Sequence, residues 1–409
     1  MLGAGGVAAL GLLCLSAISR AESVERVSPL PPSVDAFYRP PPFFERSSPG
    51  TILRVRKVPR ADRISAGVIA DTYQFLLRSS DSQGMPTAIV TTVLVPPDAH
   101  TDKLLELQLA YDSAFVDCSP SYTIFQNESD IPEAAVVGRA LQQGWNVAVT
   151  DYEGFPASFT NGLRAGYSML DATRACLSST HLTGIKKDAK VVLAGASGGA
   201  FASEWALELQ KFYAPELNFA GALLTALTPN VSSVFNSIDG TNGAGLIGSS
   251  ILGLSKEYAN MSNWVSENLV ASNANKLFQA AKSCLLETLT DLDNTDFTSF
   301  FDVPSWVEAT VPKSVIENTG IMGLHGVPNA PIYSYKGTGD QLSVVSDTDA
   351  LMAKFCDEGV DVEYYRALNV SHITSATHGY VAGWSWLSDR LNGVPVRGGC
   401  WVHNVTISK

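Results

Sequence analysis

Runs of apolar residues bounded by turn-forming residues organise the first part of the chain. Gly, Pro, Asp and Ser separate four runs rich in β-forming residues, which predict strands at residues 52–58, 67–77, 87–95 and 104–111. The third run does not alternate between apolar and polar side chains, so we expect that strand to be buried on both faces. Upstream, residues 22–50 are rich in proline and predict an extended leader packed on the surface.

Strand and helix patterns alternate from residue 132 onward. Strands are predicted at residues 145–150, 191–194, 220–227, 332–335 and 362–365, and helices at residues 132–141, 166–178, 198–211, 344–356 and 375–391. Because such alternation builds βαβ units, the chain is expected to adopt an α/β fold with a mostly parallel sheet flanked by helices.

One long segment interrupts this alternation. Residues 231–330 contain helical patterns, including 264–269 and 276–289, but no clear strand, which predicts a helical lid or cap inserted into the core. The insertion begins with a glycine-rich apolar stretch at residues 240–248, which is either the hinge of a mobile cover or a plain loop. The expected organisation is a signal peptide at 1–21, an α/β core at 22–230, the insertion at 231–330, and the rest of the core at 331–409.

The stretch from Lys190 to Phe201 carries the main candidate chemistry. It predicts a buried strand that turns sharply into a helix, with Gly-Ala-Ser-Gly-Gly at residues 195–199 in the turn. This G-x-S-x-G pattern between a strand and a helix is typical of the nucleophile elbow of α/β-hydrolases, in which a strained turn exposes a serine hydroxyl. Its glycines would let strand and helix pack closely. An ordinary glycine-rich turn is the alternative, and we favour Ser197 as a nucleophile.

A serine nucleophile needs a histidine base, which in this fold follows the serine and the acid in chain order. Chain order or position excludes His100, His181, His325 and His403. Of the two that remain, His372 lies in the segment that opens the last predicted helix, where the base is expected, whereas His378 falls inside that helix. We therefore favour His372 over His378.

The acid is expected in a loop after a later strand. Asp340 follows the predicted strand at 332–335 and a Gly-Thr-Gly turn, and it precedes the next predicted helix. Asp347 and Asp349 fall in the first turn of that helix, where their charges would complement the helix dipole. Asp340 is therefore the favoured acid.

An oxyanion hole in this fold combines the N–H after the nucleophile with an N–H from the loop after an earlier strand. Gly198 would supply the first donor. The loop that follows residues 104–111 begins with Asp112 and Ser113 and lacks the His-Gly-Gly signature of many esterases. Either of these two residues is therefore expected to supply the second donor.

Targeting signals and charge restrict the compartment and the partners. Residues 10–17 are apolar and precede Ser19-Arg20-Ala21, a pattern typical of a cleaved secretory signal that is too short to span a bilayer. No later stretch is long and apolar enough for a transmembrane helix, so a soluble, secreted, extracellular protein is expected. A net charge of −12 at pH 7 without a basic cluster disfavours nucleic acid as a partner.

The cysteines and sequons fit the same compartment. Cys14 leaves with the signal peptide, and the cysteines that remain are odd in number, so two disulfides and one free thiol are the simplest outcome. No C-x-x-C spacing suggests a metal site. Sequons predict N-glycosylation at Asn127, Asn230, Asn260, Asn369 and Asn404.

Several motifs together resemble the fungal secretory lipases related to lipase A of Candida antarctica. In family order over about residues 30–400 they are Ala110-Tyr-Asp-Ser113 with Asp117-Cys-Ser-Pro-Ser-Tyr122, Asp151-Tyr-Glu-Gly154, the 195–199 elbow, the 337–340 loop, and Ser371-His-Ile-Thr374. The resemblance implies an α/β-hydrolase with a helical lid that hydrolyses lipid esters without a cofactor. The sequence ends soon after Cys400, so the C-terminal flap of some members is expected to be short or absent.

The resemblance also assigns roles to single residues. It implies a catalytic triad of Ser197, Asp340 and His372 and an oxyanion hole formed by Asp112 and Gly198. It further implies the disulfides Cys118–Cys284 and Cys356–Cys400, with Cys176 left free.

These features predict a secreted carboxylic-ester hydrolase, most simply a monomeric triacylglycerol lipase that forms an acyl-enzyme and meets lipid esters at an oil–water interface. An esterase or acyltransferase for shorter or polar esters would use the same triad, and a peptidase is a lesser alternative. A non-catalytic binding protein of this fold is disfavoured, because it would not be expected to keep all three triad residue types in the expected loops.

Peptide mapping of the non-reduced protein tests the implied disulfides. We expect it to recover Cys118 joined to Cys284 and Cys356 joined to Cys400. The second bridge would enclose the segment that contains His372, and a bridge of this kind typically stabilises a protein by about 2–4 kcal/mol. Recovery of Cys176 in a disulfide would contradict the assignment.

Overall fold

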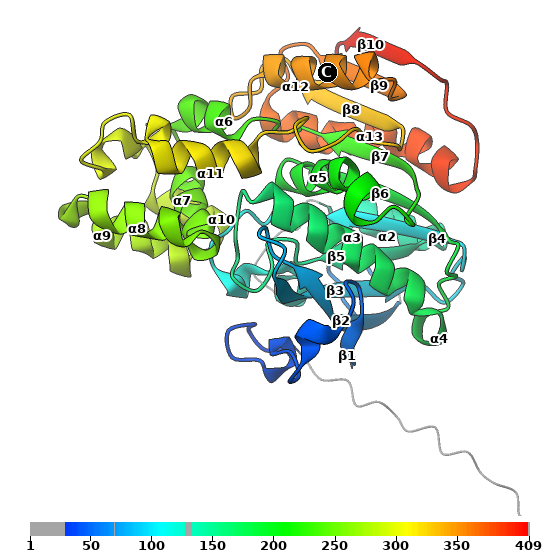
Figure 1. The fold of residues 1–409 in the computed structure, drawn as a ribbon. Helices are drawn as coiled ribbons and strands as arrows, with labels where there is room; N and C mark the ends of the chain where they lie inside the picture. Colours follow the sequence, from blue (N-terminus) through cyan, green and yellow to red (C-terminus); the bar gives the residue numbers. More distant parts are fainter. Residues whose placement is uncertain (1–28, 69, 127–132, 408–409) are drawn as a thin grey trace, which may run out of the picture.

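The computed structural model describes residues 29–68, 70–126 and 133–407 (Figure 1). The predicted signal peptide at 1–21 and the sequon at Asn127 lie outside these residues. Within them a sheet of ten strands has the order β1-β2-β3-β5-β4-β6-β7-β8-β9-β10. The strands are β1 (Ile52–Val58), β2 (Asp71–Ser80), β3 (Pro86–Val95), β4 (Lys103–Gln108), β5 (Asn146–Thr150), β6 (Lys190–Ala196), β7 (Phe219–Thr225), β8 (Ile332–Gly337), β9 (Val362–Ala367) and β10 (Cys400–Val405).

The sheet is mostly parallel, as predicted. The pairs β1–β2, β2–β3 and β3–β5 are antiparallel, and every pair from β5 to β10 is parallel. The seven central residues of β3 are buried, which agrees with its lack of alternation. Since parallel strands end at the same edge, the loops after β4, β6, β8 and β9 meet there.

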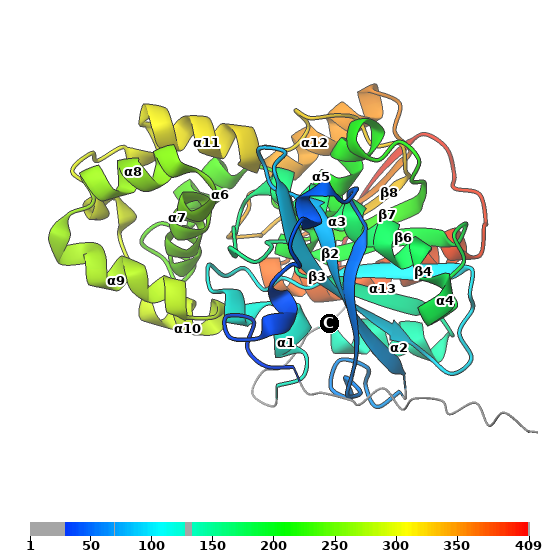
Figure 2. The same ribbon diagram turned by 60° about the horizontal axis from the view of Figure 1, so that its bottom comes forward.

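Helices cover both faces of the sheet (Figures 1 and 2). Along β6, Val191 and Leu193 face one hydrophobic cluster and Val192 and Ala194 face the other. The first cluster contains residues of α3 (Gly162–Ser178), α5 (Gly198–Tyr213) and α12 (Val345–Asp357), and the second contains residues of α2 (Ala134–Gln142) and α13 (His372–Leu391). The short helices α1 (Pro120–Thr123) and α4 (Thr180–Thr183) lie in connecting segments.

The chain between β7 and β8 is helical and stands to one side of the sheet (Figure 1, left). Its helices are α6 (Val231–Ile238), α7 (Gly245–Glu257), α8 (Ala259–Asn268), α9 (Ala274–Gln279), α10 (Leu285–Asp291) and α11 (Thr310–Gly320). No strand occurs in residues 231–330, although isolated bridges join Asn230 to Ile321 and Leu269 to Phe301. We refer to residues 231–330 as the insertion.

Several predicted boundaries were wrong. The last helix begins at His372 rather than near residue 375, because the Ser371 side chain caps it by accepting the N–H of Thr374. Strand β4 ends at Gln108, three residues early, and the chain then turns away toward the site. Strand β10 was missed because its edge position leaves it little apolar burial. The helix predicted at 276–289 is interrupted around Ser283.

The glycine-rich stretch at 240–248 also differs from a simple loop. Helix α7 begins at Gly245, and a Cβ at Gly245 would lie 2.5 Å from the backbone oxygen of Thr288 in the segment of α10. A Cβ at Gly248 would lie 2.7 Å from the Leu292 side chain. These two glycines therefore allow α7 to pack closely on α10, and only residues 240–244 are available as a flexible connection.

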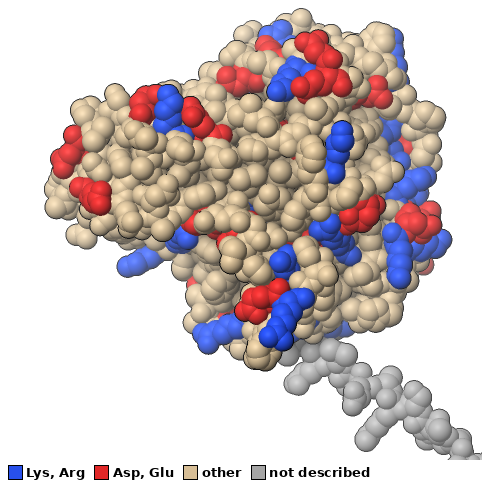
Figure 3. All heavy atoms as spheres, viewed as in Figure 1, with Lys and Arg blue, Asp and Glu red and all other residues tan. Residues whose placement is uncertain are grey.

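Two disulfides are present in the described chain, Cys118–Cys284 and Cys356–Cys400, and Cys176 is a buried free thiol. Among the described residues no helix combines the length and hydrophobicity needed to cross a bilayer. Figure 3 shows acidic and basic side chains interspersed over one face of the molecule, without a basic cluster on that face.

Candidate active site

The turn between β6 and α5 is as tight as the glycine pattern predicted. Ser197 has φ 51°, a strained value for a residue with a side chain, and its N–H donates to the Thr225 carbonyl of β7. A Cβ at Gly195 would lie 2.2 Å from the backbone of Gly199, and one at Gly198 would lie 1.9 Å from a carboxylate oxygen of Asp112. Glycine is thus required on both sides of the serine.

The structure brings Ser197, His372 and Asp340 into one hydrogen-bonded series. His372 Nε2 lies 2.8 Å from Ser197 Oγ, and His372 Nδ1 lies 2.8 Å from Asp340 Oδ2. An ionised Asp340 can only accept, so Nδ1 carries the proton and Nε2 of the neutral ring accepts from the serine hydroxyl. This is the orientation in which Nε2 can take the serine proton.

Asp340 is held by more than the histidine. Its Oδ1 accepts the N–H groups of Leu342 and Ser343, each at 2.9 Å, and its Oδ2 lies 2.8 Å from Lys336 Nζ. Burial acts to raise the pKa of Asp340, but the hydrogen bond from His372 and the Lys336 charge outweigh it and lower the pKa to about 2. The carboxylate therefore stays ionised throughout the neutral range.

The loop after β4 lies beside the elbow. Asp112 has φ 39°, another strained value, and its buried carboxyl lies against Gly198. Gly198 is the first residue of α5, so its N–H has no partner within the helix. The two residues that the resemblance assigned to the oxyanion hole thus lie together next to Ser197.

Sequence reasoning did not predict that the Asp112 carboxyl lies among other buried carboxyls, those of Glu133 and Glu153. Burial and the nearby Glu133 raise the pKa of Asp112 to about 7, and burial raises that of Glu133 to about 7. Burial and Asp112 raise the pKa of Glu153 well above its ordinary value. Charged residues beside apolar strands are visible in the sequence, but their mutual proximity is not.

Lys336 was also missed. Its side chain is fully buried in β8, and its Nζ contacts both Asp340 and the Leu227 carbonyl. The available signal was a lysine inside an otherwise apolar strand, four residues before the predicted acid.

A small apolar pocket opens beside Ser197. Its volume is about 50 Å³, and its apolar walls include Phe159, Val231, Val234, Phe235, Leu246 and Leu342. Helices α6 and α7 of the insertion supply four of these residues. Pockets that hold small molecules usually measure about 300–1,000 Å³, so the insertion leaves too little room for an ester in this conformation.

The alternative base lies elsewhere. His378 is exposed on α13 and lines an open hollow of about 720 Å³ against β8 and β9, together with Tyr333 and Tyr365. In the described structure it is His372, and not His378, whose ring lies against Ser197 Oγ. Among the sequons, Asn260, Asn369 and Asn404 are exposed, whereas the half-buried Asn230 caps α6 by accepting the N–H of Ser233.

A mostly parallel sheet with a serine elbow, an aspartate and a histidine after successive strands defines an α/β-hydrolase of the serine hydrolase class. The chain belongs to the secretory lipase family, whose model matches residues 129–399. Lipase A of Arthroderma benhamiae is 39% identical over 96% of this chain and 88% of its own length. Trichothecene C-3 esterase of Fusarium sporotrichioides is 36% identical over 92% of this chain and 88% of its own length.

Solved structures support the same fold. Candida antarctica lipase A matches with a TM-score of 0.85 and 25% identity, over 93% of this chain and 90% of that one. The cell wall degrading esterase LipA of Xanthomonas oryzae matches with a TM-score of 0.66 and 17% identity, over 84% of this chain and 98% of that one, which shows the fold alone.

The Asp340–Lys336 pair gives a prediction for stability. Asp340→Asn leaves a fully buried ammonium without its counter-charge, so we expect a loss of about 3–5 kcal/mol in unfolding free energy. Adding Lys336→Met should recover part of that loss. Denaturant unfolding at pH 7 measures both, with Ser197→Ala as a control that should unfold like the wild type.

The same pair predicts a pH dependence. The pKa of Asp340 in the fold, about 2, lies below its ordinary value of 3.8, so its contribution is complete above about pH 4 and is lost as the pH falls through 2. The stability difference between wild type and Asp340→Asn should therefore shrink in that window. A difference that is constant from pH 7 to pH 2 would contradict this assignment.

Proposed function

We propose that this chain is a secreted carboxylic-ester hydrolase, acting on lipid esters as a triacylglycerol lipase through an acyl-enzyme on Ser197. The observation that carries the proposal is the 2.8 Å contact between Ser197 Oγ and His372 Nε2, at the floor of an apolar pocket. Membership of the secretory lipase family supports the reaction class.

In the proposed first step Ser197 Oγ attacks the ester carbonyl carbon and its proton passes to His372 Nε2. Asp340 stabilises the imidazolium that forms. The oxyanion would accept hydrogen bonds from the backbone N–H groups of Gly198 and Asp112. One such donor stabilises the transition state by about 3–4 kcal/mol. The imidazolium then protonates the departing alcohol oxygen as the C–O bond breaks, which leaves the acyl group on Ser197.

In the second step a water molecule takes the place of the alcohol. His372 Nε2 accepts one water proton while the water oxygen attacks the acyl carbon. The bond between that carbon and Ser197 Oγ then breaks, which releases the carboxylic acid, and the His372 imidazolium returns the proton to Ser197 Oγ. No group outside the described site is needed for these proton transfers. An acyltransferase would use the same steps with another alcohol in place of water.

We also propose that the insertion acts as a lid. A pocket of about 50 Å³ has to enlarge before an acyl chain can reach Ser197, and α6 and α7 form much of its wall. The connection at 240–244 joins these two helices and includes Gly240 at φ 70°, so it is the candidate hinge. A lid of this kind would cover apolar surface until substrate arrives.

An esterase for smaller or more polar esters is the second candidate. One relative of similar identity is named trichothecene C-3 esterase, and Thr160, Thr228 and Ser250 add hydroxyls to the pocket wall. This candidate uses the same triad and differs from a lipase in the alcohol and acyl groups that it accepts.

The compartment and the partners are proposed on the same basis. The sequence of residues 1–21 supports secretion to the extracellular space, and the disulfides fit an oxidising compartment. We propose a monomer whose partner is a lipid ester, at an oil–water interface in the case of a lipase. N-glycans at the predicted sequons belong to the same proposal.

Hydrolysis assays on purified variants test the triad. Ser197→Ala and His372→Ala should each lose several orders of magnitude in kcat on p-nitrophenyl butyrate. Ser197→Ala should keep the wild-type unfolding midpoint, and His372→Ala should remain folded although it loses the hydrogen bond to Asp340. His378→Ala is the matched control and should retain most activity. Activity that survives in His372→Ala but not in His378→Ala would show that the base is misassigned.

Substrate profiles separate a lipase with a lid from a plain esterase. With p-nitrophenyl esters of rising chain length and emulsified triolein, a lidded lipase should show a jump in rate as the substrate passes its solubility limit. Gly243→Pro, in the proposed hinge, should blunt this jump and spare p-nitrophenyl acetate. Smooth saturation through the solubility limit, unchanged in Gly243→Pro, would favour the esterase and a fixed cap.

A further inference from the structure

The loop that bears Asp112 is held from both sides of the molecule. On the core side the Tyr152 hydroxyl donates to the Leu109 carbonyl at 2.9 Å, and the Glu153 N–H donates to the Tyr111 hydroxyl at 2.7 Å. Residues 109–118, which we call the oxyanion loop, thus rest on the chain that follows β5. This support alone places only the first half of the loop.

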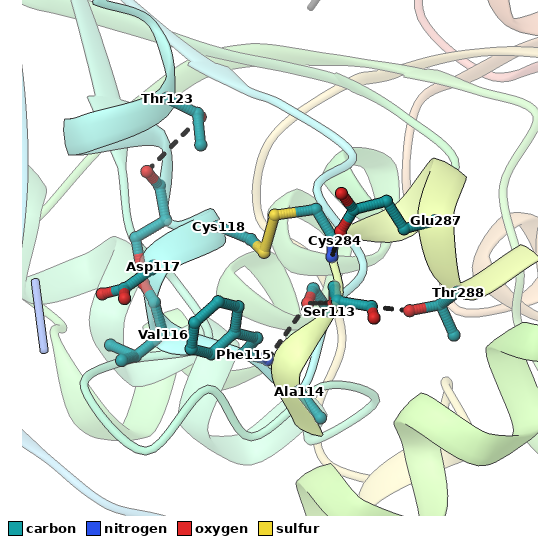
Figure 4. Close-up of a disulfide and its surroundings, with 12 residues drawn as sticks. Ser113, Ala114, Phe115, Val116, Asp117, Cys118, Thr123, Cys284, Glu287 and Thr288 are labelled. Carbon is teal, nitrogen blue, oxygen red and sulfur yellow. Dashed lines mark hydrogen bonds between the residues drawn. A yellow bond between two sulfur atoms is a disulfide. The ribbon is translucent and has the colours of Figure 1, made fainter. Parts of the chain in front are cut away.

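The second half of the oxyanion loop is held by the insertion (Figure 4). Cys118 is joined to Cys284, and the Ser113 hydroxyl donates to the Ser283 carbonyl at 2.9 Å. From α7, Lys256 Nζ donates to the carbonyl of Ala114. Three separate links therefore connect the insertion to Ser113, Ala114 and Cys118, which all follow the strained Asp112.

Lys256 also interacts with the buried carboxyl of Glu153. The charge of Lys256 acts to lower the pKa of Glu153, against burial and against Asp112 and Asp151, which raise it. Burial lowers the pKa of Lys256 itself, while Glu153 acts to raise it. The Lys256 ammonium thus lies close enough to the Glu153 carboxyl for the two charges to interact.

The end of α7 that carries Lys256 is fixed to the core. The adjacent Glu257 forms a buried ion pair with Arg164 of α3 at 2.6 Å and accepts the N–H and hydroxyl of Ser82. The Gly253 carbonyl accepts the Ser158 hydroxyl at 3.0 Å. The last turn of α7 is therefore bound firmly to the core, whereas the first turns of the same helix line the pocket beside Ser197.

We propose that Lys256 is a positioning residue that couples the insertion to the oxyanion hole, by fixing the Ala114 carbonyl and thereby the Asp112 donor relative to Gly198. The inference rests on the proposed hydrolysis at Ser197. Lys256 touches neither substrate nor the reacting atoms. Its effect is on transition-state stabilisation, because a donor displaced by about 1 Å from the developing oxyanion loses roughly 10²-fold in rate.

Kinetics of Lys256→Met on soluble p-nitrophenyl butyrate test this role. We expect kcat to fall by about ten- to a hundredfold with KM changed by less than about twofold, because the lost interaction acts only in the transition state. Lys256→Arg keeps a cationic donor and should recover most of the loss. Lys276→Met, which removes an exposed lysine of α9, is the matched control and should behave as wild type.

Two further measurements exclude a general structural effect. Ser113→Ala keeps its backbone N–H but loses the link to Ser283, so it should show the same kcat-directed loss. Binding of an alkylboronic acid, whose tetrahedral adduct on Ser197 mimics the oxyanion, should weaken in proportion to kcat/KM in both variants. Thermal unfolding of each variant should stay near the wild-type midpoint.

The outcomes separate this inference from the proposed function. If the wild type showed no ester hydrolysis, or only hydrolysis that persists in Ser197→Ala, the proposed function itself would be rejected. An active wild type with unchanged kcat in Lys256→Met would overturn the coupling alone. The coupling would also be overturned if Lys256→Met and Ser113→Ala lost activity only in step with a lowered unfolding midpoint, or if Lys256→Arg were as impaired as Lys256→Met.

Discussion

The close approach of the β6–α5 turn to the end of β4 is the constraint on which the rest of the site depends. A side chain at Gly199 would fall 2.1 Å from the Gln108 carbonyl, and one at Gly198 would meet Asp112. Because glycine occupies both positions, the turn can approach the end of β4 this closely. Ser197 then has φ 51°, and the oxyanion loop lies directly beside it. His372 follows β9 and Asp340 follows β8, and both lie beside this turn.

Buried charge then fixes those two loops. Asp340 is bound by His372, by two backbone N–H groups and by the fully buried Lys336, so its orientation does not depend on solvent. A single unpaired ion in such surroundings would cost several kcal/mol, whereas the completed pair holds Asp340 ionised beside His372. The carboxyls around Asp112 are the contrasting case, since burial raises their pKa values toward neutrality.

The insertion combines a rigid part and a pocket-lining part within one helix. The ion pair between Arg164 and Glu257 binds the end of α7 to the core, and the first turns of α7 line the pocket beside Ser197. The disulfide Cys118–Cys284 adds a covalent link between the insertion and the oxyanion loop. Any opening that admits a substrate is therefore expected to start at 240–244 and α6, while Asp112 and Gly198 keep their places beside Ser197.

The sequence by itself determined the fold class and the roles proposed for Ser197, Asp340 and His372, because strand periodicity, the glycine pattern and chain order are local signals. The prediction from sequence failed where local signals are weak. It missed the edge strand β10, which has little apolar burial, and it placed the start of α13 too late, because the Ser371 cap begins the helix at His372. Only the tertiary structure decided that Lys336 pairs with Asp340, that Glu153 faces Asp112, and that Lys256 reaches Ala114. Those contacts join residues that belong to different elements, and their energies arise from burial and charge proximity, which exist only after the chain has folded.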